Sequence, residues 1–414
     1  MDEASKRKID RGFNRMNPPD SEVTAARTVL VLSNRLPFAV HRGPKGLEKH
    51  VSPGGLVSAL EPVLRKHGGI WIGWPGLALN AGESLNGCDL PYQVQPVELS
   101  EEDVRRYYQG FSNRTLWPLL HSFPQNTQFD PDDFRAYAQV NQRFAEAAAQ
   151  VAGPSDMIWI HDYHLMLAPS TLRALRPKAT LGFFLHTPFP SYDIFRLLPW
   201  DQELLKGLLD CDLIGFHIES YLHNFLDCVE KRLGARVDHQ RMLVGYGDRT
   251  IRVEAFPIGI DFALYEQAAT SKPLVGKEPS AGQEPSANQE PSADKKPSAS
   301  ASTQSMASAT RRSPIEPAAG KIILGVDRLD YTKGIPERIR AFEHFLELYP
   351  EQREQVTLLQ VAVPSRSTVS EYQELKREID ELVGQVNGRF ATARWSPIRY
   401  VYSSFERDEL AVLY

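Results

Sequence analysis

The 414-residue sequence predicts an α/β protein built from doubly wound parallel sheets. Three observations support this fold class. Continuous apolar runs such as 29–32 are typical of strands that are buried on both faces. Segments with apolar residues at helical spacing alternate with these runs. Polar residues directly follow several of the runs, at the sheet edge where open α/β folds bind their ligands.

The first predicted domain covers residues 28–262. It opens with a strand at 28–38 and a helix at 52–69, which begins with Gly54 and Gly55 and ends at a second glycine pair. The remaining elements, in order, are a strand at 70–74, helices at 100–111 and 134–152, a strand at 156–164, a helix at 166–176, a strand at 180–186, a helix at 204–211, a strand at 213–217, a helix at 221–234 and a strand at 250–261.

A linker and a second domain follow. Between about 272 and 319 a six-residue repeat carries PSA at 279, 285, 291 and 297, and this composition cannot bury a core, so we predict a flexible Pro/Ser/Ala-rich segment at 263–319. Residues 320–414 predict strands at 321–330, 356–366 and 398–405, which alternate with helices at 333–350, 369–387 and 406–414. Three βα units are fewer than the five or six strands of a complete nucleotide-binding sheet, so this second domain is expected to be incomplete.

Composition excludes several classes of protein. With 42% hydrophobic and 24% charged residues the chain is typical of a globular protein, and its net charge of −5 gives no overall basic field for nucleic acid or anionic lipid. Residues 1–27 lack the apolar segment of a secretory signal, so we expect a disordered tail, and no apolar window is long enough to span a membrane. Three widely spaced cysteines, Cys88, Cys211 and Cys228, predict neither disulfides nor a zinc site and indicate a reducing, cytoplasmic location.

Polar residues recur at the predicted strand ends. They are Ser33–Arg35, His161–His164, His186–Pro188, Asp327–Asp330 and Pro364–Arg366. A single member is weak evidence, but the whole set predicts a ligand site. The glycines Gly54 and Gly55 at a helix start could admit a phosphate to free backbone N–H groups, or they could simply form a tight turn. Neither the dinucleotide nor the P-loop fingerprint is present.

Each candidate side chain has a structural alternative. His161, Asp162 and His164 could ligate a metal, but their spacing is not a zinc motif, so Asp162 is favoured as a hydroxyl acceptor or base, with capping of the next helix as the alternative. Arg328, Lys333 and Arg366 could hold a diphosphate leaving group, or they could pair with nearby acids. The aromatic candidates for stacking against sugar rings, with burial in the core as their alternative, are Trp71, Trp74, Tyr107, Tyr108 and Trp117.

Ten motifs occur in an order that resembles the trehalose-6-phosphate synthases. They are SNRLP, GGL, WIGWPG, YYQGFSNRTLWP, WIHDYHLMLAP, GFFLHTPFPS, LIGFH, FPIGID, VDRLDYTKGIPERI and VPSR. These enzymes are retaining glycosyltransferases of GT-B architecture, with two facing Rossmann-like domains. The resemblance covers residues 28–414 apart from the repeat-containing insertion.

The resemblance implies transfer of glucose from UDP-glucose to glucose 6-phosphate with retention, giving α,α-trehalose 6-phosphate and UDP without a metal or another cofactor. It assigns catalytic roles to Asp162, His186, Arg328 and Lys333. Acceptor binding falls to Arg35, Trp74, Tyr108, Trp117, Asp162 and Arg366. Donor binding falls to Gly54, Gly55, His186, Arg328 and Lys333.

Partners and completeness follow from the same resemblance. Besides the two substrates, we expect a homo-oligomer and association with trehalose-6-phosphate phosphatase or other trehalose-synthesis subunits, and no nucleic acid or membrane partner. The family's second domain continues into a loop of the type DGMNLVAKE, and nothing like it occurs before Tyr414. The sequence is therefore expected to be truncated at its C-terminus, and a catalytically incompetent regulatory subunit is the alternative to an active synthase.

Overall fold

The computed structural model describes residues 28–43, 46–51, 55–77, 90–260, 262–271, 320–365, 370–405 and 407–414. The chain divides into two compact units, Met1–Ile260 and Asp261–Tyr414. The predicted tail, the PSA repeat and three residues with predicted features, Gly54, Cys88 and Arg366, lie outside the described residues.

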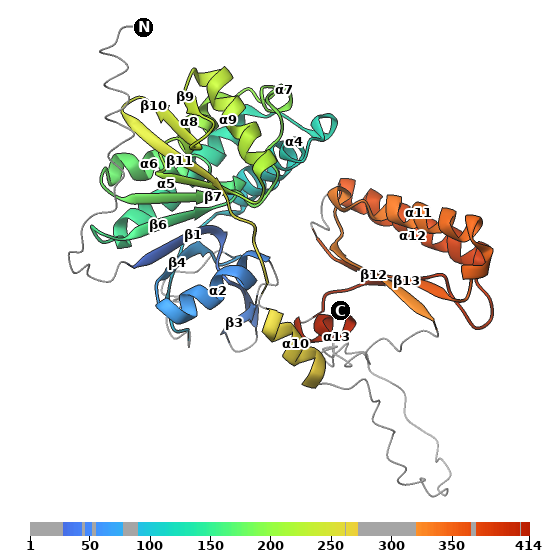
Figure 1. Ribbon diagram of the computed structural model, residues 1–414. Helices are drawn as coiled ribbons and strands as arrows, with labels where there is room; N and C mark the ends of the chain where they lie inside the picture. Colours follow the sequence, from blue (N-terminus) through green and yellow to red (C-terminus); the bar gives the residue numbers. More distant parts are fainter. Residues whose placement is uncertain are drawn as a thin grey trace, which may run out of the picture. The chain divides into compact units, whose positions relative to one another are not determined.

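A nine-stranded sheet forms the first unit (Figure 1). Its strands, in spatial order, are β5 (Gln93–Pro96), β4 (Ile70–Trp74), β1 (Val29–Arg35), β6 (Met157–His161), β7 (Thr180–Phe184), β8 (Leu213–Phe216), β11 (Arg249–Ala255), β10 (Leu243–Tyr246) and β9 (Arg236–Asp238). The strands from β5 to β11 run parallel, whereas β10 and β9 pair antiparallel. The predicted parallel α/β arrangement is therefore confirmed, with an additional antiparallel edge.

The strand order reverses at β1. The chain leaves β1 to form β4 on one side, and it later places β6 on the other side, with β7 and β8 beyond. In open α/β sheets the crevice at such a switch point, outside the carboxyl ends of the strands, is the usual ligand site. The carboxyl ends of β1 and β6, which are Arg35 and His161, therefore flank the expected ligand site of this unit.

Helices cover both faces of the sheet near this point. Helix α2 (Gly55–His67) packs Leu60 and Leu64 in one core cluster with Val31 and Trp71. Leu30, which alternates with these strand residues, is fully buried as well, so the opposite face is also covered. The other helices of the unit are α3 (Glu101–Asp103), α4 (Trp117–Leu120), α5 (Pro131–Val151), α6 (Ala168–Leu175), α7 (Tyr192–Phe195), α8 (Asp201–Leu208) and α9 (Glu219–Leu233).

The helix predicted at 100–111 differs from expectation in its backbone pattern. After the short α3, residues Val104–Leu116 form a π-helix, in which the N–H of Trp117 donates to the carbonyl of Ser112. Long-range contacts hold this wider helix: its Arg114 pairs with Asp133 of α5 at 2.9 Å. Such contacts are not visible in side-chain periodicity, and π-helical segments commonly mark functional sites.

Replacement of Gly110 in the π-helix by alanine is expected to destabilise the folded protein. A Cβ at this position would overlap the carboxylate of Asp133, which is 3% exposed and fixed by Arg114. We expect Gly110→Ala to lower the free energy of unfolding by about 1–3 kcal/mol because the buried carboxylate has no free volume. Urea unfolding followed by tryptophan fluorescence measures this change.

Gly384→Ala is the matched control for that substitution. Gly384 lies inside α12 (Ser370–Phe390), and no heavy atom outside the local helix backbone lies within 4 Å of the place where its Cβ would stand, so alanine should stabilise the helix slightly. Equal stability of Gly110→Ala and the parent protein would show that the Asp133 site adapts freely.

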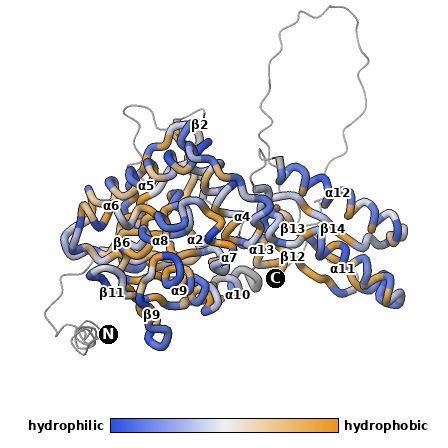
Figure 2. Tube along the Cα trace, turned by 90° about the horizontal axis from the view of Figure 1, so that it is seen from above, coloured by the Kyte–Doolittle hydropathy of each residue, from blue (hydrophilic) through white to orange (hydrophobic). Residues whose placement is uncertain are grey.

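A three-stranded parallel sheet forms the second unit. Its order is β12 (Lys321–Arg328), β13 (Val356–Val363) and β14 (Ile398–Tyr402). Helix α11 (Ile335–Leu348) connects β12 to β13, α12 connects β13 to β14, and both helices pack on the sheet through one apolar cluster. Figure 2 shows α12 as largely hydrophilic along its length, consistent with one solvent-facing side.

Several shorter elements fall outside the sequence predictions, among them β5, β9 and β10 of the large sheet. Strands β2 (Phe38–Gly43) and β3 (Gly46–Val51) form an antiparallel hairpin after β1. Helix α10 (Phe262–Ser271) occupies residues that the sequence analysis assigned to the linker, and it contacts α13 (Arg407–Leu413) within the second unit. The helical periodicity of α10 is weak, which is why composition alone gave no helix there.

Candidate active site at the strand ends

Arg35 is held between aromatic rings at the carboxyl end of β1. Its guanidinium carbon lies 4.4 Å from the ring centroid of Trp74, at the end of β4, and 5.5 Å from that of Tyr108 on the π-helix. Arg35 forms no ion pair with any acidic side chain that the structure describes. Cation–π contacts can orient a guanidinium without neutralising it, so this cation is available to an anionic ligand.

The two other predicted aromatic residues in this region belong to the scaffold. Trp71 and Tyr107 are fully buried. The indole N–H of Trp71 donates to the Ser33 hydroxyl at 2.8 Å, and the Tyr107 hydroxyl donates to the Asn34 side-chain oxygen at 3.0 Å. Their core alternative is therefore correct, and they fix the strand end that presents Arg35.

Trp74 and Trp117 are also nearly buried, at 6% and 5% exposure. The face of Trp74 is covered by Arg35, and Trp117 packs on Tyr163 with ring centroids 5.7 Å apart. Both indoles can shape the wall of a ligand site, but neither presents an open face for stacking. Tyr108 is half-buried and stacks on His164 at 5.7 Å, which joins the Arg35 cluster to the end of β6.

Asp162 lies at the centre of the second cluster in an unusual backbone conformation. Its φ of 73° and ψ of 166° are rarely adopted by residues other than glycine, and such conformations concentrate at functional sites. Its carboxylate accepts from the backbone N–H of His186 at 3.3 Å and lies 3.8 Å from the His164 ring. The side chain makes no capping hydrogen bond to the following turn, so the helix-cap alternative is wrong.

Two buried polar residues of α5, which the sequence analysis missed, hold the turn that follows Asp162. The Tyr137 hydroxyl donates to the Tyr163 carbonyl at 2.7 Å and accepts from the Met166 N–H at 3.0 Å. The Asn141 amide donates to the His164 carbonyl and accepts from the first backbone N–H groups of α6. The sequence feature that could have identified them is a tyrosine and an asparagine four residues apart on the apolar side of a predicted helix.

Three histidines meet at the ends of β6, β7 and β8. His161 Nδ1 lies 3.0 Å from His186 Nε2, and the His186 ring is 5.6 Å from that of His217. Burial lowers the pKa of all three imidazoles. The pKa of His161 lies well below its usual range, and burial together with the neighbouring His217 lowers that of His186 to about 3. These rings are therefore neutral near neutral pH.

This neutral pair predicts acid sensitivity of the fold. Unfolded histidines bind a proton below about pH 6.5, whereas folded His161 and His186 resist protonation, so stability is complete above that pH and is lost as the pH falls. We expect the two residues together to lower the unfolding free energy by about 3 kcal/mol per pH unit between roughly pH 6 and pH 4. Urea unfolding at several pH values, compared with His161→Asn/His186→Asn, measures their share. An identical slope in both proteins would contradict the assignment.

The glycine candidate is only partly described. Gly55 is the first residue of α2, is exposed, and has no heavy atom within 4 Å of the place where a Cβ would stand. This position leaves room for a ligand near the start of the helix.

In the second unit the basic candidates lie at and just after the carboxyl end of β12. Arg328 is its last residue, and the exposed Lys333 ends the short 3₁₀ turn Tyr331–Lys333. Lys333 forms no ion pair within the described ranges. Of the acids nearby in the sequence, Asp327 pairs with Arg338 at 2.6 Å, Glu337 contacts Arg340, and Asp330 accepts from Thr332 and Tyr372.

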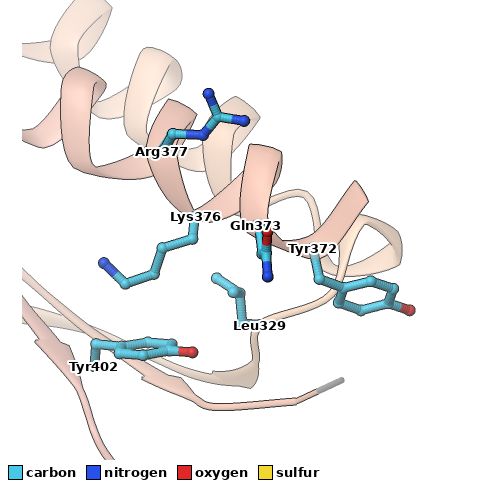
Figure 3. Close-up of a pocket in the computed structure, with 6 residues that line it drawn as sticks. All are labelled: Leu329, Tyr372, Gln373, Lys376, Arg377 and Tyr402. Atoms are coloured by element: carbon cyan, nitrogen blue, oxygen red, sulfur yellow. The ribbon is translucent and has the colours of Figure 1, made fainter. Parts of the chain in front are cut away.

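The second unit also contains a pocket of about 300 Å³ (Figure 3). Its lining consists of Leu329, Tyr372, Gln373, Lys376, Arg377 and Tyr402. It therefore lies among residues next to the carboxyl ends of β12 and β14, where parallel sheets bind ligands. Lys376 stands 4.7 Å from the Tyr402 ring centroid and pairs with Asp380, so its charge is partly neutralised.

Two further findings concern metal binding and membrane crossing. Among the residues that the structure describes, no group of three His, Cys, Asp or Glu side chains is placed to hold a metal ion. Over the same residues, no helix is both long and apolar enough to cross a membrane.

The fold and the strand-end clusters define an α/β glycosyltransferase of the GT-B class. Residues 27–281 and 299–414 match the model of glycosyltransferase family 20, and the chain belongs to that family. The family resemblance and the fold class that the sequence predicted are therefore confirmed.

Named relatives agree with this assignment. A trehalose-6-phosphate synthase of Mycobacterium ulcerans is 38% identical over 97% of this chain and 76% of its own length. The Burkholderia xenovorans α,α-trehalose-phosphate synthase (UDP-forming) in complex with glucose 6-phosphate is 31% identical, with a TM-score of 0.75 over 93% of this chain and 77% of that one. An E. coli structure bound with UDP-2-fluoro glucose is 28% identical, with a TM-score of 0.73 over 93% and 76%.

Proposed function

We propose that the chain is a trehalose-6-phosphate synthase that transfers glucose from UDP-glucose to glucose 6-phosphate with retention. The observation that carries this proposal is Arg35, a guanidinium oriented by Trp74 and Tyr108 without an acidic partner in the described structure. It lies at the strand-order switch point, where a phosphate-bearing sugar would meet a cation and aromatic walls. The names of the relatives, one of them in complex with glucose 6-phosphate, support the same acceptor.

On the acceptor side, Arg35 binds the phosphate of glucose 6-phosphate, with Arg366 as its predicted second cation. Tyr108 lies beside Arg35 and completes the phosphate site. The Asp162 carboxylate accepts a hydrogen bond from a sugar hydroxyl. The strained backbone of Asp162 fixes the direction of this carboxylate, and α5 holds the turn that follows it. Trp74 and Trp117 form the wall that limits the size of the sugar.

On the donor side, the bond between C1 of glucose and the β-phosphate oxygen of UDP breaks as the acceptor hydroxyl attacks from the same face. Negative charge develops on the departing diphosphate, and Arg328 and Lys333 neutralise it. The acceptor hydroxyl proton passes to the leaving phosphate oxygen, which balances the transfer. His186 contacts the donor glucose, while the backbone at Gly54 and Gly55 approaches the phosphates.

The test is release of UDP from UDP-glucose by the full chain, with glucose 6-phosphate or glucose as acceptor. We expect turnover with glucose 6-phosphate, little with glucose, and an α,α-linked phosphorylated product by NMR. Equal rates with both acceptors would overturn phosphate recognition. Binding of both substrates without any UDP release would instead favour the catalytically incompetent, regulatory subunit.

We also propose a cytoplasmic location. Cys211 and Cys228 are buried free thiols, and burial raises the pKa of Cys228 to about 12 and that of Cys211 further. Such inert thiols suit a reducing compartment. A homo-oligomer and association with trehalose-6-phosphate phosphatase stay predictions.

A further inference from the structure

His161 is a fully buried histidine to which the proposed reaction gives no task. It is the last residue of β6, and the parallel pairing of β6 with β7 places it beside the segment that carries His186. Its Nδ1 lies 3.0 Å from Nε2 of His186. Its other nitrogen, Nε2, is buried and has no hydrogen-bond partner within the described structure.

A hydrogen bond between two neutral imidazoles contains one proton, so only two arrangements exist. In the first, His161 Nδ1–H donates to His186 Nε2, His161 Nε2 is a bare lone pair, and His186 carries its proton on Nδ1. In the second, His186 Nε2–H donates to His161 Nδ1, His161 carries a proton on Nε2, and His186 Nδ1 is bare. The two arrangements give His186 opposite chemistry at its free nitrogen.

Two observations favour the first arrangement. The second would bury an N–H at His161 Nε2 without an acceptor, and unpaired buried N–H groups are rarer than under-satisfied acceptors. The Asp162 carboxylate, which accepts from the backbone N–H of His186 at 3.3 Å, lies near the backbone side of that residue. A negative charge there favours a proton on Nδ1, the ring nitrogen adjacent to Cγ.

We infer that His161 is a positioning residue that fixes His186 in the tautomer with its proton on Nδ1. His186 therefore presents a hydrogen-bond donor to its ligand, and the group that it recognises is an oxygen acceptor, such as a hydroxyl of the donor sugar. This inference deepens the proposed function and rests on it for the identity of the ligand. The lowered pKa values of both histidines agree, because neither ring then carries a second proton at neutral pH.

The tautomer can be measured directly on the full chain. Two-bond ¹H–¹⁵N correlation spectra of protein labelled at histidine distinguish Nδ1–H from Nε2–H, and His186→Gln identifies the signals of residue 186. We expect wild-type His186 to be protonated on Nδ1 at pH 7.5. Protonation on Nε2 in the wild-type protein would overturn the inference, whatever the enzyme does.

Variants of His161 connect the tautomer to function. His161→Leu removes the donor and should shift His186 toward the Nε2–H form, lowering kcat/KM for UDP-glucose about tenfold with little change in the KM for glucose 6-phosphate. His161→Asn keeps an amide N–H close to the position of Nδ1 and should retain both the tautomer and the activity within about twofold.

His239→Leu, at an exposed histidine of the same unit, is the control for loss of an imidazole. A tautomer of His186 that does not change in His161→Leu contradicts the positioning role. Absence of turnover in the wild-type chain contradicts the proposed function instead, and the spectrum of His186 still decides this inference.

Discussion

Arg35→Ala should raise the KM for glucose 6-phosphate by about 10- to 100-fold while kcat changes little. A hydrogen bond to a charged group contributes about 1.5–3 kcal/mol, and Arg35 offers its guanidinium to a phosphate with no competing acid in the described structure. The aromatic contacts at 4.4 and 5.5 Å already orient the side chain, so little entropy is lost when the phosphate binds. The measurement is steady-state kinetics with glucose 6-phosphate varied at saturating UDP-glucose.

Three further variants test whether the rise in KM comes from loss of phosphate binding by the Arg35 guanidinium. Arg35→Lys keeps the charge without the planar fork and should fall between the wild type and alanine. Arg366→Ala should raise the same KM, as the sequence predicts for the second phosphate cation. Arg65→Ala is the control, because Arg65 lies exposed on α2 and pairs with Glu61 of the same helix. An unchanged KM in both Arg35→Ala and Arg366→Ala would refute the phosphate assignment.

The strand-end residues could be predicted because their signals are local. A buried parallel strand is a short apolar run, and the residue that follows it must lie at the carboxyl edge of the sheet. Arg35, Asp162 and His186 therefore fall where the sequence analysis placed them, at the ends of β1, β6 and β7. The clustering of Arg35 with Trp74 and Tyr108 depends on strand order, which the motif resemblance implied but the apolar runs alone do not specify.

The residues that support the site could not be predicted in this way. Tyr137 and Asn141 act on backbone groups more than twenty residues away, so their partners depend on how α5 packs. The π-helix over Val104–Leu116 has the side-chain pattern of an ordinary helix, and long-range anchors such as Asp133 hold its backbone. Strands β9 and β10 are short and partly polar, so they depend on their neighbours in the sheet: β10 pairs with β11, and β9 pairs with β10.

Lys333→Ala should lower kcat by about 10²- to 10³-fold, corresponding to about 2.7–4 kcal/mol, the usual effect of losing one preorganised electrostatic donor. The 3₁₀ turn that carries Lys333 is fixed at both ends. At its start Asp330 accepts from the Thr332 N–H at 3.0 Å and from the Tyr372 hydroxyl at 3.0 Å, and at its end Gly334 adopts a left-handed conformation with φ of 61°. A turn that is rigid before substrate binds needs little reorganisation as charge develops on the leaving diphosphate.

The expected loss is in kcat because the charge of UDP grows as the glycosidic bond breaks, so the ammonium of Lys333 binds the transition state more tightly than the ground state. Turnover at saturating concentrations of both substrates measures this loss. Arg328→Ala should lower kcat to a similar extent. Lys321→Ala is the matched control: Lys321 is an exposed lysine at the opposite, amino end of the same strand β12. Wild-type turnover in Lys333→Ala, or an equal loss of turnover in Lys321→Ala, would contradict the assignment of Lys333 to the leaving-group site.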